Sequence, residues 1–156
     1  MLIQSAEESY QRGLRALSDG RGTEAMALFE AAIRISWRGR GSRPQARYLS
    51  YYGLCLALVR SESREGLRFC REAVTLESYN ADIRCNLGRV LLNVGRRSEA
   101  YRCFVRGLAS GGDHPAIRSA LRSMGIRSRS TLPFLPRHSR LNVLLGRLRA
   151  NGWRSV

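Results

Sequence analysis

The sequence of 156 residues contains no lysine, although 27 of its residues are arginine. A GC-rich genome produces an arginine-only basic set through codon bias, so part of the formal net charge of +15 can be present without a function. The chain also has no GxxxxGK[ST] phosphate-binding loop, whose lysine reaches the nucleotide phosphates. The charge total therefore does not by itself identify a partner.

Residues that commonly carry catalysis or metals are scarce. The two histidines, His114 and His138, have no metal-ligand spacing to a cysteine, and no two cysteines form a CxxC pair. The twelve acidic residues are scattered and offer little acid–base chemistry. We therefore expect no enzyme, no metal and no cofactor. The cysteines are expected to be reduced core thiols in a cytoplasmic protein; they are Cys55, Cys70, Cys85 and Cys103.

Long hydrophobic runs and proline are also scarce. The longest nearly apolar run, YYGLCLALV, ends before Arg60 and is far shorter than the ~20 residues that span a bilayer. The first ten residues, MLIQSAEESY, contain acids before any apolar run develops, so we expect no signal peptide. Proline occurs four times, and 44% of the residues are hydrophobic. This composition predicts a folded all-α protein.

Three stretches of the chain repeat one spacing of small and aromatic residues. The intervals are 12, 4 and 3 residues in the first and third copies, and 13, 4 and 3 in the second. The positions are Gly13, Ala25, Phe29 and Ala32; Gly53, Gly66, Cys70 and Ala73; and Gly88, Ala100, Phe104 and Gly107. Apolar residues at helical offsets on either side of a turn predict a helix hairpin in each copy.

The spacing also predicts how each hairpin packs. The glycine and the alanine should lie where the two helices cross, and the phenylalanine should fill the gap to the following hairpin. Gly20 and Gly95 mark turns, and Thr23 and Ser98 are expected to cap the second helices of the first and third hairpins.

This pattern resembles the tetratricopeptide repeat (TPR) family, and in particular a small bacterial TPR protein. The resemblance implies a right-handed superhelical array of three helix hairpins with C-terminal capping helices. The hairpins would cover about residues 3–37, 44–78 and 80–112, with an Arg/Gly-rich inserted loop at 37–44.

In such arrays the first helices line a concave surface that commonly holds a peptide. By resemblance, the partner-binding positions here are Tyr10, Arg47, Tyr51, Asn86, Arg89 and Asn93. The last three share a helix face, and their side chains offer several donors for a peptide backbone or a carboxylate. The alternative is that they are ordinary solvent-facing residues. Tyr10 and Leu14 stand where the carboxylate-clamp subfamily has lysine and asparagine, so such a clamp is not expected.

The C-terminal part, residues 113–156, is strongly basic. From residue 114 onward it holds nine arginines and no acid, whereas residues 1–113 hold eighteen arginines and twelve acids. Asp113 is expected to cap a helix with an apolar face, and a last helix at about 139–150 carries a leucine stripe. The tail can cover the end of the array, or it can dock on a partner or an anionic membrane. Its arginines include Arg127, Arg129, Arg137, Arg140, Arg147 and Arg149.

The sequence thus predicts a non-catalytic adaptor or scaffold that binds a protein or peptide partner through the concave surface. The alternative function is an arginine-rich module that binds nucleic acid or an anionic membrane surface through its tail.

Overall fold

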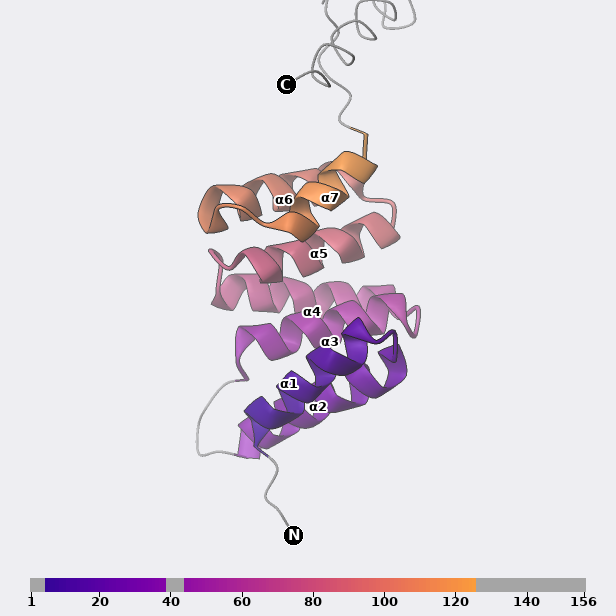
Figure 1. Ribbon diagram of the computed structural model, residues 1–156, viewed down its shortest axis with the longest axis vertical. Coiled ribbons are helices and arrows are strands. Elements are labelled where there is room, and N and C mark those ends of the chain that lie inside the picture. The colour runs from indigo at the N-terminus through magenta and orange to yellow at the C-terminus, as the bar shows by residue number, and fades with distance from the viewer. Residues whose placement is uncertain (1–4, 39–43, 126–156) are drawn as a thin grey trace, which may run out of the picture. The chain divides into compact units, whose positions relative to one another are not determined.

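The computed structural model describes residues 5–38 and 44–125 of the chain (Figure 1). The chain divides into two compact units, Met1–Leu121 and Arg122–Val156. Only residues 122–125 of the second unit are described. The predicted tail arginines and the predicted leucine-striped helix lie outside the described residues, as does most of the predicted inserted loop.

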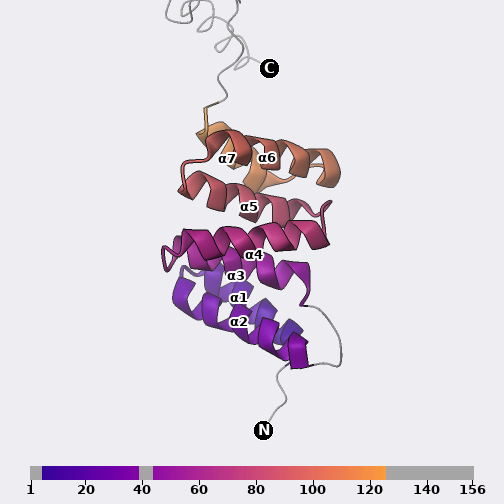
Figure 2. The ribbon, with the colours of Figure 1, turned by 180° about the vertical axis from the view of Figure 1, so that it is seen from behind.

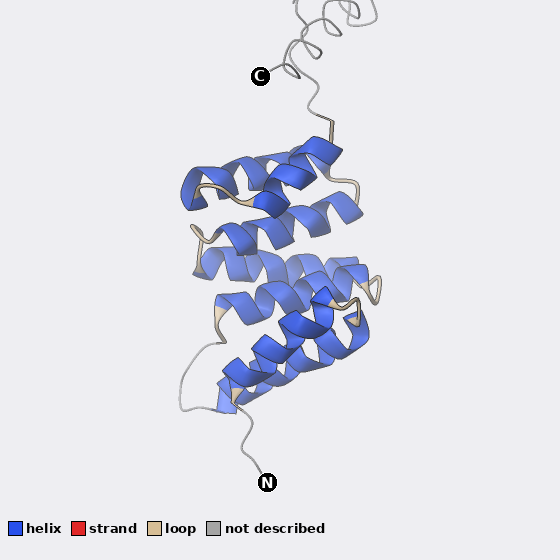
Figure 3. Ribbon diagram, viewed as in Figure 1, coloured by secondary structure: helices blue, strands red, loops and turns tan. Residues whose placement is uncertain are grey.

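Seven α-helices and no strand make up the regular structure of the described ranges (Figure 3). They confirm the predicted all-α array of helix hairpins. In chain order they are α1 (Ala6–Ser18), α2 (Gly22–Arg38), α3 (Ala46–Leu58), α4 (Ser63–Leu76), α5 (Ala81–Asn93), α6 (Arg97–Gly111) and α7 (Pro115–Ser123). None of these seven helices, as far as the described residues go, has the length and apolarity needed to cross a bilayer.

The helices pack as three consecutive hairpins within the unit that ends at Leu121. The pairs α1–α2, α3–α4 and α5–α6 form the hairpins, and α2, α3, α4 and α5 also pack against their neighbours in the next hairpin. The first helices α1, α3 and α5 lie toward the viewer in Figure 1, and the second helices α2, α4 and α6 lie toward the viewer in Figure 2. The unit therefore has a first-helix face and a second-helix face.

The repeated small residues lie at the helix crossings, as the spacing predicts. A Cβ atom on Gly13 would lie 2.6 Å from the ring of Phe29, and one on Gly88 would clash with the ring of Phe104. The expected place of the phenylalanine needs a correction, because the ring packs first on the glycine of its own hairpin. Phe29 also reaches the next hairpin, since its ring centroid lies 5.5 Å from that of Tyr51.

The second hairpin crosses in a different way. A Cβ atom on Gly53 would lie 2.7 Å from the carbonyl oxygen of Gly66, and one on Gly66 would lie 2.5 Å from the carbonyl oxygen of Gly53. Cys70 takes the place of the phenylalanine and is fully buried. Two backbones therefore meet at the glycines, and the aromatic contact between the two helices is made beside them, by Tyr52 and Phe69 at 5.1 Å between ring centroids.

The predicted caps Thr23 and Ser98 are wrong, because each is the second residue of its helix. Gly95 explains this for the third hairpin. Its φ of +77° reverses the chain after α5, and the Arg96 N–H donates to the Leu91 carbonyl oxygen at 2.9 Å. The backbone closes the turn so tightly that α6 begins at Arg97, and the side chain of its N-cap residue Arg96 makes no capping hydrogen bond.

The end of the third hairpin carries α7, which acts as a short covering helix. Ile117 is fully buried, and its side chain lies against Gly107 of α6. The expected cap by Asp113 is also wrong, because α7 begins at Pro115 and the residue before it is His114; Asp113 instead pairs with Arg118 at 2.8 Å. The ring of His114 does the capping, since its Nδ1 atom accepts a hydrogen bond from the Ile117 N–H at 3.2 Å.

The expected inserted loop begins later than predicted. Trp37 and Arg38 are the last residues of α2, so helix continues through the first two positions assigned to the loop. Trp37 is exposed, and Pro44, at the other end, is buried. The positions between 38 and 44 lie outside the described residues.

Candidate functional site

The six predicted partner-binding residues all come from the three first helices. Tyr10 lies on α1, Arg47 and Tyr51 lie on α3, and Asn86, Arg89 and Asn93 lie on α5. They differ in what their side chains contact, and these contacts separate residues that hold the hairpins together from residues that remain accessible.

Tyr10 belongs to the core between the first two hairpins. Only 6% of it is exposed, and its ring lies 5.9 Å from Phe29, 5.1 Å from Tyr48 and 5.7 Å from Tyr51, measured between centroids. Burial raises the pKa of Tyr10, because the phenolate would lose its hydration. Its side chain packs in the structure and offers little surface to a partner.

Arg47 joins the first hairpin to the second through Glu7. Its Nη2 atom lies 2.7 Å from the Glu7 carboxylate, and the hydroxyl of Tyr48 donates to the same carboxylate at 2.9 Å. The Arg47 guanidinium also lies 5.0 Å from the centre of the Tyr10 ring. A hydrogen bond from Gln11 lowers the pKa of Glu7, helped by Tyr48 and Arg47. Arg47 is therefore half-exposed but already carries a carboxylate partner.

Asn86 and Tyr51 form a polar contact between α3 and α5. Asn86 is 4% exposed, and its Nδ2 atom donates to the hydroxyl of Ser50 at 3.1 Å. Tyr51 is half-buried, and burial raises its pKa, with a smaller contribution from the negative charge of Asp82. A hydrogen bond with Asn86 acts in the opposite direction on that pKa. Asn86 therefore satisfies buried polar groups, while part of Tyr51 reaches the surface.

Asn93 and Arg89 play different roles at the other end of α5. Asn93 donates to the Ala57 carbonyl oxygen at 3.2 Å and to the Ser63 hydroxyl at 3.3 Å, and so joins α5 to the second hairpin. Arg89 is exposed and has no ion pair within the described part of the chain. Its positive charge acts on Tyr51 and on the thiols of Cys55 and Cys85. Arg89 is thus the residue of the six with a free charged group.

Two acids on this face were missed by sequence reasoning. Glu7, Arg47 and Asp82 each stand six residues before the first glycine of their repeat, so they occupy equivalent positions on α1, α3 and α5. An alignment of the three copies would have shown that this position carries a negative, a positive and a negative residue in turn. The first-helix face therefore carries both acids and arginines.

All four cysteines are free thiols, and three of them are buried. Burial raises the pKa of Cys55 to about 11, of Cys85 to about 11 and of Cys70 to about 12. Cys103 is half-buried, and burial raises its pKa as well. These thiols stay protonated at neutral pH, which makes them poor nucleophiles. Across residues 5–38 and 44–125, no three His, Cys, Asp or Glu side chains gather closely enough to hold a metal ion.

No known protein family matches this sequence. No curated protein matches it either.

Solved structures do resemble the fold. The Arabidopsis OM64 TPR domain has a TM-score of 0.61 at 16% sequence identity, and the likeness covers 77% of this chain and 93% of that one. PcrH, in complex with the chaperone binding region of PopB, has a TM-score of 0.57 at 18% identity, with 80% and 95% of the two chains covered. MamA has a TM-score of 0.55 at 16% identity, with 80% and 71% covered.

These identities are low, so the likeness is one of backbone arrangement. It agrees with the array of helix hairpins that the sequence resemblance predicts. The chain therefore has the fold of the tetratricopeptide repeat.

Proposed function

We propose that this chain is a non-catalytic adaptor or scaffold that binds a peptide or protein partner through its first-helix face. The solved structure of PcrH, which resembles this chain in fold, is of a complex with a binding region of another protein. That complex supports a protein partner for the present chain, whose identity the fold does not specify.

The observation that carries the proposal is the exposed guanidinium of Arg89 on α5, whose charge acts on the half-buried Tyr51 of α3. Arg89 has no carboxylate partner among the described residues, and its five N–H donors match a carboxylate or a row of backbone carbonyl oxygens. Tyr51 adds an aromatic surface with a hydroxyl, a combination that is common at binding hot spots. Arg47, half-exposed at one edge of the face, can extend the contact.

The other three predicted residues have supporting roles. Tyr10, Asn86 and Asn93 pack or hydrogen-bond within the array, so they stabilise the surface on which Arg89 and Tyr51 lie. This division sharpens the test, because a change at Arg89 alters the surface without removing a contact between hairpins.

The first test is capture of the partner from a lysate of the native host, followed by mass spectrometry. We expect Arg89→Ala to lower the amount of captured partner about tenfold, a typical loss for one charged hot-spot residue. Arg64→Ala is the matched control, because Arg64 is an exposed arginine on α4 that forms no ion pair within the described ranges. Circular dichroism should show unchanged helix content in both variants. Equal capture by wild type and Arg89→Ala would contradict the first-helix face as the binding surface.

A second candidate function is an arginine-rich module for nucleic acid or an anionic membrane. It is favoured by the nine arginines and the absence of acids from residue 114 onward. Mixing the chain with DNA and with anionic vesicles at low and at near-physiological salt tests it. Weak binding that disappears at the higher salt is expected from charge alone. Tight binding that survives the higher salt would favour this second function over the adaptor.

We also propose a cytoplasmic location. Four free cysteines, three of them buried, suit a reducing compartment. Labelling of the thiols after rapid unfolding of the purified native protein tests this: four reactive thiols are expected, and fewer would indicate disulfides.

A further inference from the structure

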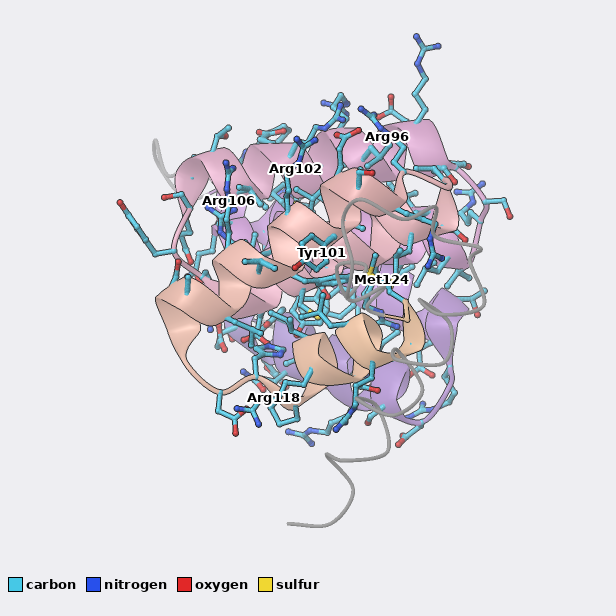
Figure 4. All side chains as sticks on the ribbon, turned by 90° about the horizontal axis from the view of Figure 1, so that it is seen from above. Arg96, Tyr101, Arg102, Arg106, Arg118 and Met124 are labelled. Carbon is cyan, nitrogen blue, oxygen red and sulfur yellow. The ribbon has the colours of Figure 1, made fainter. Side chains whose placement is uncertain are left out.

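The outward side of α6 carries an apolar pair that the rest of the third hairpin does not use. Tyr101 is 46% exposed and Val105 is 42% exposed, and the two residues stand one helical turn apart. Figure 4 looks down on α6 and shows Tyr101 over the helix, with Arg102 and Arg106 to one side. We refer to Tyr101, Arg102, Val105 and Arg106 as the α6 patch.

The repeat shows why this position is normally covered. Tyr101 follows Ala100 directly, as Met26 follows Ala25 in the first hairpin and Leu67 follows Gly66 in the second. Met26 and Leu67 are both half-buried, because a following hairpin packs against their helices. Tyr101 holds the same register on α6, so its side chain suits a packed environment.

The covering helix α7 does not bury the patch. Its buried residue Ile117 lies against Gly107, near Arg84 of α5, so it occupies the α5 side of the third hairpin. The other side of α6 keeps Tyr101 and Val105 exposed. Part of the outward side of α6 therefore stays uncovered in the unit up to Leu121.

Charge selects the kind of partner that fits. Arg102 and Arg106 flank the apolar pair, and neither forms an ion pair with any residue in the described part of the chain. The nearest acid on the helix, Glu99, is already engaged by Arg96 at 2.6 Å and by Arg71 at 3.8 Å. Burial raises the pKa of the neighbouring Cys103 thiol, while the charges of Arg102 and Arg106 lower it and that of Glu99 raises it.

We propose that the α6 patch is a second docking surface, whose partner is an acidic amphipathic helix from another protein. The apolar stripe of that helix packs on Tyr101 and Val105, and its carboxylates pair with Arg102 and Arg106. The ligand would pack on α6 as the following hairpins pack on α2 and α4. This surface is separate from the first-helix face, because α6 is a second helix.

Charge complementarity favours this occupant over two others. A second copy of the chain would bring its own Arg102 and Arg106 against the same residues across a symmetric interface, and like charges repel. The chain's own residues 126–156 contain seven arginines and no acid, so their charge does not complement the patch either. An acidic partner removes the repulsion and adds ion pairs.

The test measures binding of designed peptides to the full-length chain by fluorescence anisotropy. The probe is a helical peptide of about 16 residues with a leucine stripe flanked by glutamates, and the matched peptide has arginines in place of the glutamates. We expect the acidic peptide to bind and the basic one to bind at least about tenfold more weakly. Tyr101→Ala should weaken the acidic peptide about 30-fold. The double change Arg102→Gln with Arg106→Gln should weaken it and reduce its salt dependence.

Two variants with changes away from the α6 patch are the controls. Tyr79→Ala removes a more exposed tyrosine elsewhere, and Arg12→Gln removes an exposed arginine on α1, so both should bind the peptide like the wild type. Failure of the full-length chain to bind, or equal binding by Tyr101→Ala, would overturn the proposal. Binding that arises only after removal of residues 126–156 would assign the patch to the chain's own segment. Concentration-dependent dimers that Tyr101→Ala abolishes would assign it to a second copy.

Discussion

The first and third hairpins cross over an aromatic ring, whereas the second hairpin crosses backbone against backbone. Phe29 and Phe104 fill the space above Gly13 and Gly88, so a small residue on one helix accepts a large residue from the other. In the second hairpin, the carbonyl oxygen of Gly66 lies against Gly53 and the carbonyl oxygen of Gly53 lies against Gly66, so neither glycine has room for a Cβ atom. The same hairpin fold is thus reached with different side-chain volumes at equivalent positions.

This comparison shows where substitution can be tolerated. A clash with a ring can be relieved by a smaller side chain, because side chains can change volume without moving the chain. A clash with a backbone oxygen can be relieved only by moving a whole helix. The two kinds of crossing should therefore respond differently to the same change.

The largest effect is expected from removing the ring. Phe104→Ala should lower the free energy of unfolding by about 3–5 kcal/mol, because a fully buried aromatic side chain leaves a cavity over Gly88. Cys70→Ala changes the equivalent residue of the second hairpin and should cost only about 1 kcal/mol, because it removes a single buried atom. Urea denaturation of both variants measures the difference. Similar losses for Phe104→Ala and Cys70→Ala would contradict the distinction between the crossings.

A smaller effect separates the two kinds of clash. Gly66→Ala and Gly88→Ala should each lower the free energy of unfolding by about 1–3 kcal/mol through overpacking. Adding Phe104→Leu to Gly88→Ala should recover part of the loss relative to the sum of the single changes, because the smaller residue makes room. Adding Cys70→Ala to Gly66→Ala should recover nothing, since the Gly53 carbonyl oxygen stays in place. The two double-mutant cycles should be measured by urea denaturation. Equal coupling energies in both cycles would contradict the distinction between a crossing over a ring and a crossing of two backbones.

The smallest effect concerns the polar contact between the first two hairpins. The folded-state pKa of Glu7 is lowered from 4.5, so the stability that its carboxylate contributes is present at neutral pH. That contribution is lost as the pH falls below about 4.5 through the folded-state value. Glu7→Gln should therefore have a melting temperature that falls less steeply than the wild type between about pH 6 and pH 3. The effect is small because the pair with Arg47 is half-exposed.

Glu8→Gln is the control for that measurement. Glu8 is an exposed neighbour whose carboxylate forms no ion pair within residues 5–38 and 44–125. It should keep the wild-type pH dependence of the melting temperature. An identical pH dependence for Glu7→Gln and the wild type would show that the contact with Arg47 and Tyr48 adds nothing to stability.

The hairpins were predictable from the sequence because their determinants are local. The apolar residues at helical offsets and the glycines at turns and crossings of one hairpin lie within about 35 residues of each other, so they can be identified directly from the spacing of the repeats. The N-cap Ser98 was mispredicted because backbone hydrogen bonds close the turn at Gly95. The preference of serine and threonine for N-cap positions does not take such backbone hydrogen bonds into account. The capping role of His114 was missed because histidine is an uncommon cap.

The candidate site was only partly predictable. The sequence pattern placed six residues on the first helices, and the structure has all six there. Only the packing of one hairpin on the next decided that Tyr10 and Asn86 are buried while Arg89 stays exposed, because the burial of a side chain depends on which residues from distant repeats lie against it. The periodic sequence thus determined the hairpins and their order, and tertiary contacts across some 40 residues, such as Arg47 with Glu7, decided which polar groups remain available to a partner.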